Sequence, residues 1–62
     1  MLIALDYDNT YTLDPTFWDG FIVVSKARGH NVIVATMRSQ LEGYAVEYDL
    51  KDKVDDIIFT NR

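Results

Sequence analysis

The sequence predicts a small α/β domain built around a three-stranded parallel sheet with the element order βαβαβ. Short, mostly apolar runs at residues 2–5, 32–35 and 57–60 are typical of parallel strands. Two segments with apolar residues at helical spacing separate these runs, and parallel strands are joined by right-handed crossovers. If the strands lie in chain order, both helices cover the same face of the sheet.

The first helix is predicted to begin after Asp14 and to end at Gly29. Asp14 followed by Pro15 combines a capping carboxylate with a proline at the first helical position, and glycine commonly follows the last turn. Gly20 weakens the helix and would suit close packing against the sheet. The apolar residues at helical spacing are expected to form the buried face or an interface; they are Phe17, Trp18, Phe21, Ile22 and Val24.

The second helix is predicted to begin at a capping box formed by Ser39 and Glu42. Gly43 lies in its first turn and is expected to loosen it. One helical face is expected to be lined by Leu41, Tyr44, Ala45 and Tyr48. A charged connector at residues 50–56 then leads into the third strand.

Size, charge and composition limit the functional classes. The 62 residues make one domain, 48% of them hydrophobic and 26% charged, as in an ordinary globular chain. The absence of cysteine excludes a disulfide framework, and the net charge of −4 disfavours nucleic acid and anionic membranes as partners. No segment is long and apolar enough to cross a membrane and no basic region precedes the first apolar run, so we expect a cytoplasmic protein.

The second face of the predicted sheet would be bare. It would carry alternate residues of three apolar strands, and a contiguous apolar surface of that size is not stable in a soluble monomer. We therefore expect a second copy of the chain, a partner chain or further polypeptide to cover it.

Polar residues follow the first two strands where each strand ends. Asp6 and Asp8 terminate the first run, and burying unpaired carboxylates there would be costly. In an open parallel sheet, the carboxyl ends of the strands form the ligand crevice. Two acids at this edge can hold a hard cation, and one can attack a phosphorus centre. Thr36 ends the second strand, and Arg38 follows it. The guanidinium of Arg38 suits binding of a phosphate, but an ordinary solvated cation at the start of a helix is an equally good interpretation.

Asp6, Asp8 and Thr10 after one apolar strand, with Thr36 after a second, resemble the first two motifs of the haloacid dehalogenase (HAD) superfamily of phosphohydrolases. The likeness is greatest to small, capless members found in bacteria and phages. It implies that Asp6 is the nucleophile and Asp8 the general acid and base. It further implies that Mg²⁺ is held by the Asp6 carboxylate and the Asp8 backbone carbonyl, with waters and a further acid.

The resemblance also implies a phosphate-binding set, with a phosphorylated small molecule or nucleotide as substrate. The Thr36 hydroxyl would donate to the phosphate, beside the free amides of Arg38, Ser39 and Gln40 at a helix N-terminus. Asn9 stands where relatives commonly have glycine, and asparagine also tolerates left-handed backbone. The complete set comprises Asn9, Thr10, Thr36, Met37 and Arg38. Tyr11 and Thr12 could also touch substrate from a flap, although ordinary loop positions are the favoured interpretation of both.

The lysine and acids of the family's third and fourth motifs, which follow the third strand in relatives, have no counterpart in this sequence. The predicted topology puts the available lysines and acids at the opposite edge of the sheet; they are Lys26, Lys51, Lys53, Asp55 and Asp56. Arg62 alone emerges at the correct edge, where it could partly replace the lysine. His30 lacks nearby ligand partners. These departures leave open a second hypothesis, a catalytically incomplete HAD-derived binding or inhibitory protein.

Overall fold

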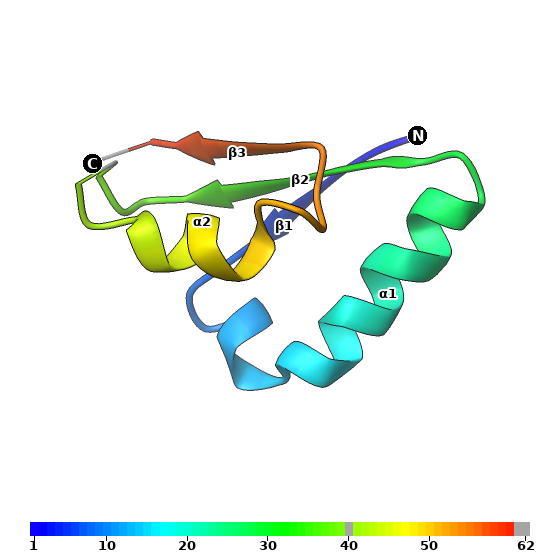
Figure 1. Cartoon of the computed structure of the whole chain (residues 1–62), viewed down its shortest axis with the longest axis horizontal. Helices are drawn as coiled ribbons and strands as arrows, with labels where there is room; N and C mark the ends of the chain where they lie inside the picture. The colour runs from blue at the N-terminus through cyan, green and yellow to red at the C-terminus, as the bar shows by residue number, and fades with distance from the viewer. Residues whose placement is uncertain (40, 61–62) are drawn as a thin grey trace.

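The computed structural model describes residues 1–39 and 41–60 and has the predicted α/β architecture (Figure 1). Strands β1 (Leu2–Asp6), β2 (Asn31–Thr36) and β3 (Asp56–Phe59) form one parallel sheet in the order β1-β2-β3. The connections contain the 3₁₀ helix η1 (Tyr11–Leu13) and the α-helices α1 (Pro15–Ala27) and α2 (Tyr44–Leu50). The predicted strand boundaries are correct to within one residue at each end.

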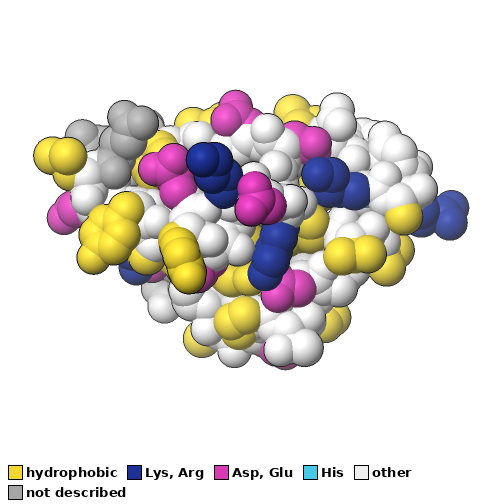
Figure 2. All heavy atoms as spheres, in the orientation of Figure 1, with side chains coloured by type: hydrophobic (Ala, Val, Ile, Leu, Met, Phe, Trp, Pro, Cys, Tyr) yellow, Lys and Arg dark blue, Asp and Glu magenta, His cyan; other side chains and the backbone are white. Residues whose placement is uncertain are grey.

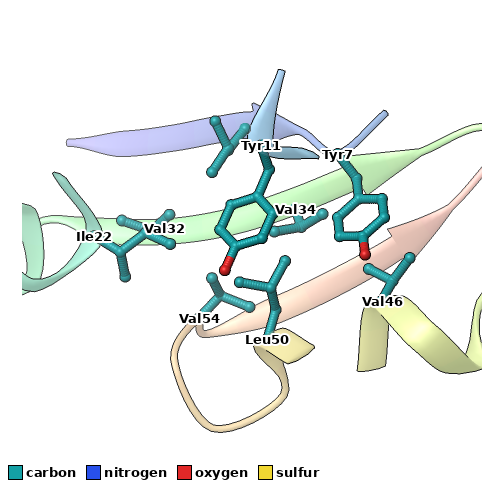
Figure 3. Close-up of a cluster of buried hydrophobic side chains, with 9 residues drawn as sticks. Tyr7, Tyr11, Ile22, Val32, Val34, Val46, Leu50 and Val54 are labelled. Atoms are coloured by element: carbon teal, nitrogen blue, oxygen red, sulfur yellow. The ribbon is translucent and has the colours of Figure 1, made fainter. Parts of the chain in front are cut away.

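Both α-helices lie on the same face of the sheet, as predicted (Figure 1). The core between the layers is small and mostly aliphatic. Val32 and Val34 of β2 are fully buried between Ile22 of α1 and Val46 of α2 (Figure 3). The remaining core residues are Leu5, Tyr7, Tyr11, Leu50 and Val54.

Helix α1 begins and ends where its local sequence predicts. The carboxylate of Asp14 accepts a hydrogen bond from the amide of Phe17 at 3.3 Å, which caps the first turn. At the other end, Gly29 has a positive φ of 85°. Its amide donates to the Lys26 carbonyl, and the His30 amide donates to that of Ser25, both at 3.0 Å. These two bonds form a Schellman motif, which requires the left-handed conformation that glycine adopts easily.

The buried face of α1 differs from the predicted one. Ile22 is buried, and Trp18 packs against the core, but Phe17 is 57% exposed and Val24 58% exposed. The apolar positions extend around more of the helix than the sheet can cover, so the periodicity did not determine which of them face inward. Gly20 does not mark close packing either, because a Cβ there would have no atom within 4 Å.

The second helix starts later than predicted. Ser39 and Glu42 make the reciprocal hydrogen bonds of a capping box, at 3.0 to 3.3 Å, but they close a separate turn, and α2 starts only at Tyr44. Gly43 precedes it and packs directly on the ring of Phe59, which a Cβ would enter. The role of Gly43 is therefore close contact with β3.

The apolar stripe predicted for this helix points outward. Leu41, Tyr44 and Tyr48 are 91%, 75% and 90% exposed, while Val46 and Leu50 form the buried face. Figure 2 shows hydrophobic side chains standing on the surface over α2. No helix in the described part of the chain is long and apolar enough to span a membrane.

No helix in residues 1–39 and 41–60 covers the other face of the sheet, which we call the open face. Leu2 is 66% exposed and Ile58 43% exposed, and the strand pleat puts Ala4 and Ile33 on the same face. Asp6 and Asp56 also belong to this face at its ends. The bare face is therefore apolar in its centre and acidic at two of its corners, whereas the sequence predicts apolar residues throughout.

Candidate functional site

The parallel register brings the ends of β1 and β2 to a common edge of the sheet. Asp6 lies opposite Ala35, so it is one residue away from the level of Thr36. Thr36 in turn lies opposite Phe59, and its carbonyl accepts a hydrogen bond from the Thr60 amide at 2.8 Å. We call this the carboxyl edge, because all three strands end there.

The pleat directs Asp6 and Thr36 to different faces of the sheet. Asp6 is exposed and alternates with the buried Leu5, so it belongs to the open face. Thr36 is only 2% exposed and lies in line with Val32 and Val34 on the covered face. A ligand that contacts both side chains would therefore have to lie over the strand ends rather than on either face.

The chain leaves β1 through a tight turn. Asn9 has a φ of 62°, so this position adopts the left-handed backbone that asparagine was expected to tolerate. The Asn9 amide donates to the hydroxyl of Thr12 at 3.1 Å, and the Tyr7 carbonyl accepts from the amides of Thr10 and Thr12. Asn9 is exposed and Thr10 half-buried. The turn brings Asp8 back toward the loop that follows β2.

Asp8 and Arg38 form an ion pair across the carboxyl edge. Nε of Arg38 donates to Oδ2 of Asp8 at 3.1 Å and Nη2 donates to Oδ1 at 2.8 Å. This two-bond geometry joins a residue of the first predicted motif to one that follows the second. The hydrogen bonds to Asp8 raise the pKa of the Arg38 guanidinium, which stays protonated. The side chain of Arg38 is 36% exposed and that of Asp8 is 42% exposed, which leaves both accessible to a ligand.

Tyr7 lies beneath Arg38 and was not predicted as part of the site. The guanidinium carbon is 5.3 Å from the centroid of the Tyr7 ring, within the range of a cation–π interaction. The Tyr7 hydroxyl donates to Asp49 of α2 at 3.0 Å, and burial followed by this contact raises the pKa of the phenol. Strand alternation could have identified Tyr7, because it is the inward-facing residue between two aspartates.

The amides that follow Thr36 do not form the predicted helix N-terminus. The Arg38 amide donates to the Thr36 hydroxyl at 3.2 Å, and the Ser39 amide donates to the Glu42 carboxylate at 3.3 Å. An acid of the chain thus already takes the position where the prediction placed an anion. Met37 is 64% exposed. Two residues lie outside the described ones: Gln40, from the predicted amide set, and Arg62, which was considered as a partial replacement for the lysine.

Tyr11 belongs to the core and not to a substrate-contacting flap. It is 4% exposed, and its ring stacks on that of Tyr7 with the centroids 5.7 Å apart. Figure 3 shows the two rings side by side. Its hydroxyl donates to Asp19 of α1 at 2.7 Å, and burial and this bond raise the pKa of the phenol. Thr12 contributes its hydroxyl to the Asn9 turn. Both residues stabilise the loop after β1.

The charges predicted for the opposite edge are found on that side. Lys26 pairs with Asp55 at 3.5 Å, and Lys53 pairs with Asp19 at 3.1 Å. Asp55 also accepts a hydrogen bond from the amide of Val32, near the start of β2, at 2.7 Å. His30 contacts the N-terminal ammonium group through Nδ1 at 2.8 Å. These contacts engage the side chains of Lys26, Lys53, Asp55 and His30 with groups outside the carboxyl edge.

The residues at the carboxyl edge are compatible with a Mg²⁺ site of few protein ligands. Mg²⁺ is commonly bound through one or two carboxylates, with substrate phosphates and waters completing the octahedron. Asp6 forms no ion pair within the described residues, so its carboxylate is available, whereas both oxygens of Asp8 bond to Arg38. No cluster of three or more histidine or acidic ligands occurs in residues 1–39 and 41–60. The further acid implied by the resemblance therefore has no counterpart there.

The carboxyl edge carries a guanidinium, which can bind an oxyanion, and the exposed carboxylate of Asp6, which is a possible type of nucleophile. The Thr36 hydroxyl lies at the same edge but on the covered face of the sheet. Comparisons with protein-family models, with curated proteins and with solved structures found no match to this chain. Function is therefore inferred from the residues at this edge.

Proposed function

We propose that the protein is a Mg²⁺-dependent phosphatase of the HAD type, which hydrolyses a phosphomonoester through an aspartyl-phosphate on Asp6. The observation that supports this best is the Asp8–Arg38 pair, which lies at the edge of the sheet where β1 ends in Asp6 and β2 ends in Thr36. A nucleophile, a proton carrier and an oxyanion ligand are the groups that such a reaction needs.

The proposed chemistry divides one displacement between two steps. A carboxylate oxygen of Asp6 attacks phosphorus, a new O–P bond forms and the ester P–O bond breaks, while Asp8 donates a proton to the leaving oxygen. Asp8 then takes a proton from water, which attacks phosphorus and releases Asp6 and phosphate. Arg38 and the Thr36 hydroxyl hold the phosphoryl oxygens. Bound Mg²⁺ would neutralise charge on these oxygens, with the Asp6 carboxylate and the Asp8 carbonyl as its protein ligands.

The proposed substrate is a phosphorylated small molecule or a nucleotide. The site residues lie on an open rim, where Asp6, Asn9 and Met37 are exposed, so a substrate can reach the phosphate position from solvent. The net charge of −4 weakens binding of long nucleic acid. We also propose a cytoplasmic location, which suits a chain without cysteine.

The phosphatase proposal is tested by p-nitrophenyl phosphate hydrolysis with and without Mg²⁺. We expect Mg²⁺-dependent turnover in the wild-type chain and a loss on the order of 10³-fold or more in Asp6→Asn, since removal of a nucleophile has effects of this size. Asp52→Asn, in the exposed connector, is the matched control and should keep its rate. Wild-type protein without turnover, or equal rates in Asp6→Asn and wild type, would disprove the proposal.

A second candidate function is binding or inhibition by a catalytically incomplete HAD-like domain. Two observations favour it: the apolar open face of the sheet with Leu2 and Ile58, and the engagement of both Asp8 oxygens by Arg38. A second copy or a partner chain would cover the sheet face in this case. Phosphate binding without any hydrolysis of p-nitrophenyl phosphate would support this second function.

The mass of the protein in solution tests whether a second copy covers the sheet. Under this proposal, light scattering gives a dimer or larger assembly, and Ile58→Lys on the open face shifts it to monomer. Leu13→Lys, which changes an exposed residue of η1, should leave the mass unchanged. If the wild-type protein were a monomer at every concentration and bound no hydrophobic dye, the open face of the sheet would not be an exposed apolar surface that needs a partner.

A further inference from the structure

Tyr7 is a rigid platform for Arg38. The guanidinium carbon lies 5.3 Å above the ring centroid, while the ring itself stacks on Tyr11 and its hydroxyl is bonded to Asp49. Tyr7 is only 5% exposed. Its side chain belongs to the buried cluster drawn in Figure 3. The cation therefore rests on a ring that is held from two other directions, and its position does not depend on Asp8 alone.

The interaction of Asp8 with Arg38 involves one side of the guanidinium and is weak. An arginine has five N–H donors, and its hydrogen bonds to described side chains use the one on Nε and one on Nη2, both with Asp8. Ion pairs between side chains as exposed as these shift an equilibrium by about fivefold or less. A phosphate dianion competes for the same guanidinium at little cost.

We infer that Tyr7 is a positioning residue, which keeps the Arg38 guanidinium in place while it exchanges the Asp8 carboxylate for the phosphate oxygens of the substrate. The inference rests on the proposed phosphatase function and extends it. No covalent bond changes in the exchange. Its consequence is that phosphate on Arg38 increases the fraction of Asp8 that is unpaired, which makes this carboxylate more available for proton transfer when a substrate is bound.

Binding of inorganic phosphate to the full chain tests the exchange without any need for turnover. Affinity is measured by titration, with the side-chain Nε signals of the arginines followed by NMR and that of Arg38 identified by its loss in Arg38→Lys. Asp8→Asn removes the competing charge, so we expect about three- to fivefold tighter phosphate binding and a shifted Arg38 signal. Asp6→Asn is the charge-matched control, because Asp6 lies at the same edge but does not pair with Arg38. The gain in phosphate affinity should be smaller in Asp6→Asn than in Asp8→Asn.

The role of the Tyr7 ring is tested by a pair of substitutions. Tyr7→Phe keeps the platform and removes only the bond to Asp49, so phosphate affinity should stay within about twofold of wild type. Tyr7→Leu removes the ring and should weaken phosphate binding by about two- to fivefold, the range of an exposed cation–π contact. In turnover, Tyr7→Leu should raise KM more than it lowers kcat. Circular dichroism establishes that each variant is folded.

If Tyr7→Leu does not fold, the double substitution Asp8→Asn with Arg38→Lys tests the exchange by itself. Lysine cannot form the forked pair, so Asp8→Asn should then improve phosphate binding no more than Asp6→Asn does. Asp8→Asn that binds no tighter than Asp6→Asn in the wild-type background would overturn the inference whether or not the protein turns over substrate. Tighter binding in Asp8→Asn without turnover would support the exchange and remove only the phosphatase proposal.

Discussion

The two edges of the sheet both carry charged side chains, but they use them differently. At the opposite edge, which we call the amino edge because all three strands begin there, Asp55 pairs with Lys26 and accepts a hydrogen bond from the amide of Val32. Its charge therefore connects the segment before β3 to α1 and β2. At the carboxyl edge, Asp8 pairs with Arg38 while Asp6 pairs with no cation in the described residues. The amino edge uses its acid to hold elements together, whereas the carboxyl edge keeps the Asp6 carboxylate exposed and the Arg38 side chain partly exposed.

The largest stability effect is expected where β3 and α2 meet at the carboxyl edge. Gly43→Ala inserts a methyl group into the space of the Phe59 ring and should lower the free energy of unfolding by about 1–3 kcal/mol, the usual range for overpacking. Gly20→Ala is the matched control, because its Cβ would enter open space inside α1, and it should raise stability by up to about 1 kcal/mol. Urea unfolding followed by circular dichroism measures both. Equal changes in the two variants would show that the carboxyl edge is not closely packed.

A smaller effect is expected from the structural acid of the amino edge. Asp55→Ala leaves the amide of the buried Val32 without its side-chain acceptor and should cost about 1–2 kcal/mol in unfolding free energy. Asp56→Ala removes an acid that, within residues 1–39 and 41–60, accepts a side-chain hydrogen bond only from the amide of its neighbour Ile57, and the free energy of unfolding should stay within about 0.5 kcal/mol of wild type. Asp8→Asn at the opposite edge should also cost less than about 1 kcal/mol. If Asp8→Asn proved as costly as Asp55→Ala, the distinction between the two edges would fail.

The smallest effect concerns pH. The hydrogen bond from Tyr11, followed by the contacts with Lys53, lowers the pKa of Asp19 below its ordinary value. A carboxyl group whose pKa is lower in the folded state stabilises the fold above its unfolded pKa, near pH 4, and this contribution disappears as the pH falls through the folded value. Thermal unfolding at pH 6 and pH 3 should show a smaller acid loss in Asp19→Asn than in wild type, by less than about 1 kcal/mol because Asp19 is partly exposed. Identical acid losses would refute this assignment.

Local signals predicted the strands and α1 well. Asp14 caps α1 through an amide three residues away, and Gly29 ends it through carbonyls within four residues of it. These interactions form within a single turn of the chain, so their residues can be recognised from spacing alone. The same holds for the left-handed turn at Asn9.

Local signals failed for α2 because a distant contact determines where this helix begins. Ser39 and Glu42 form their capping hydrogen bonds, yet Gly43 packs on Phe59, sixteen positions further along the chain. The packing of β3 against this segment therefore determines its path and turns Val46, rather than Tyr44 or Tyr48, toward the sheet. Periodicity among many apolar residues cannot identify which of them a neighbouring element will cover.

The sequence by itself determined the order of the elements and the edge to which Asp6, Asp8, Thr36 and Arg38 belong, since strand order and direction follow from backbone patterns and chain connectivity. Only the tertiary structure decided which side chains meet there. Contacts between segments far apart in the chain produce the Asp8–Arg38 pair, the cation–π contact of Arg38 with Tyr7 and the burial of Tyr11. Such contacts arise when the layers pack, and no spacing along the sequence encodes them.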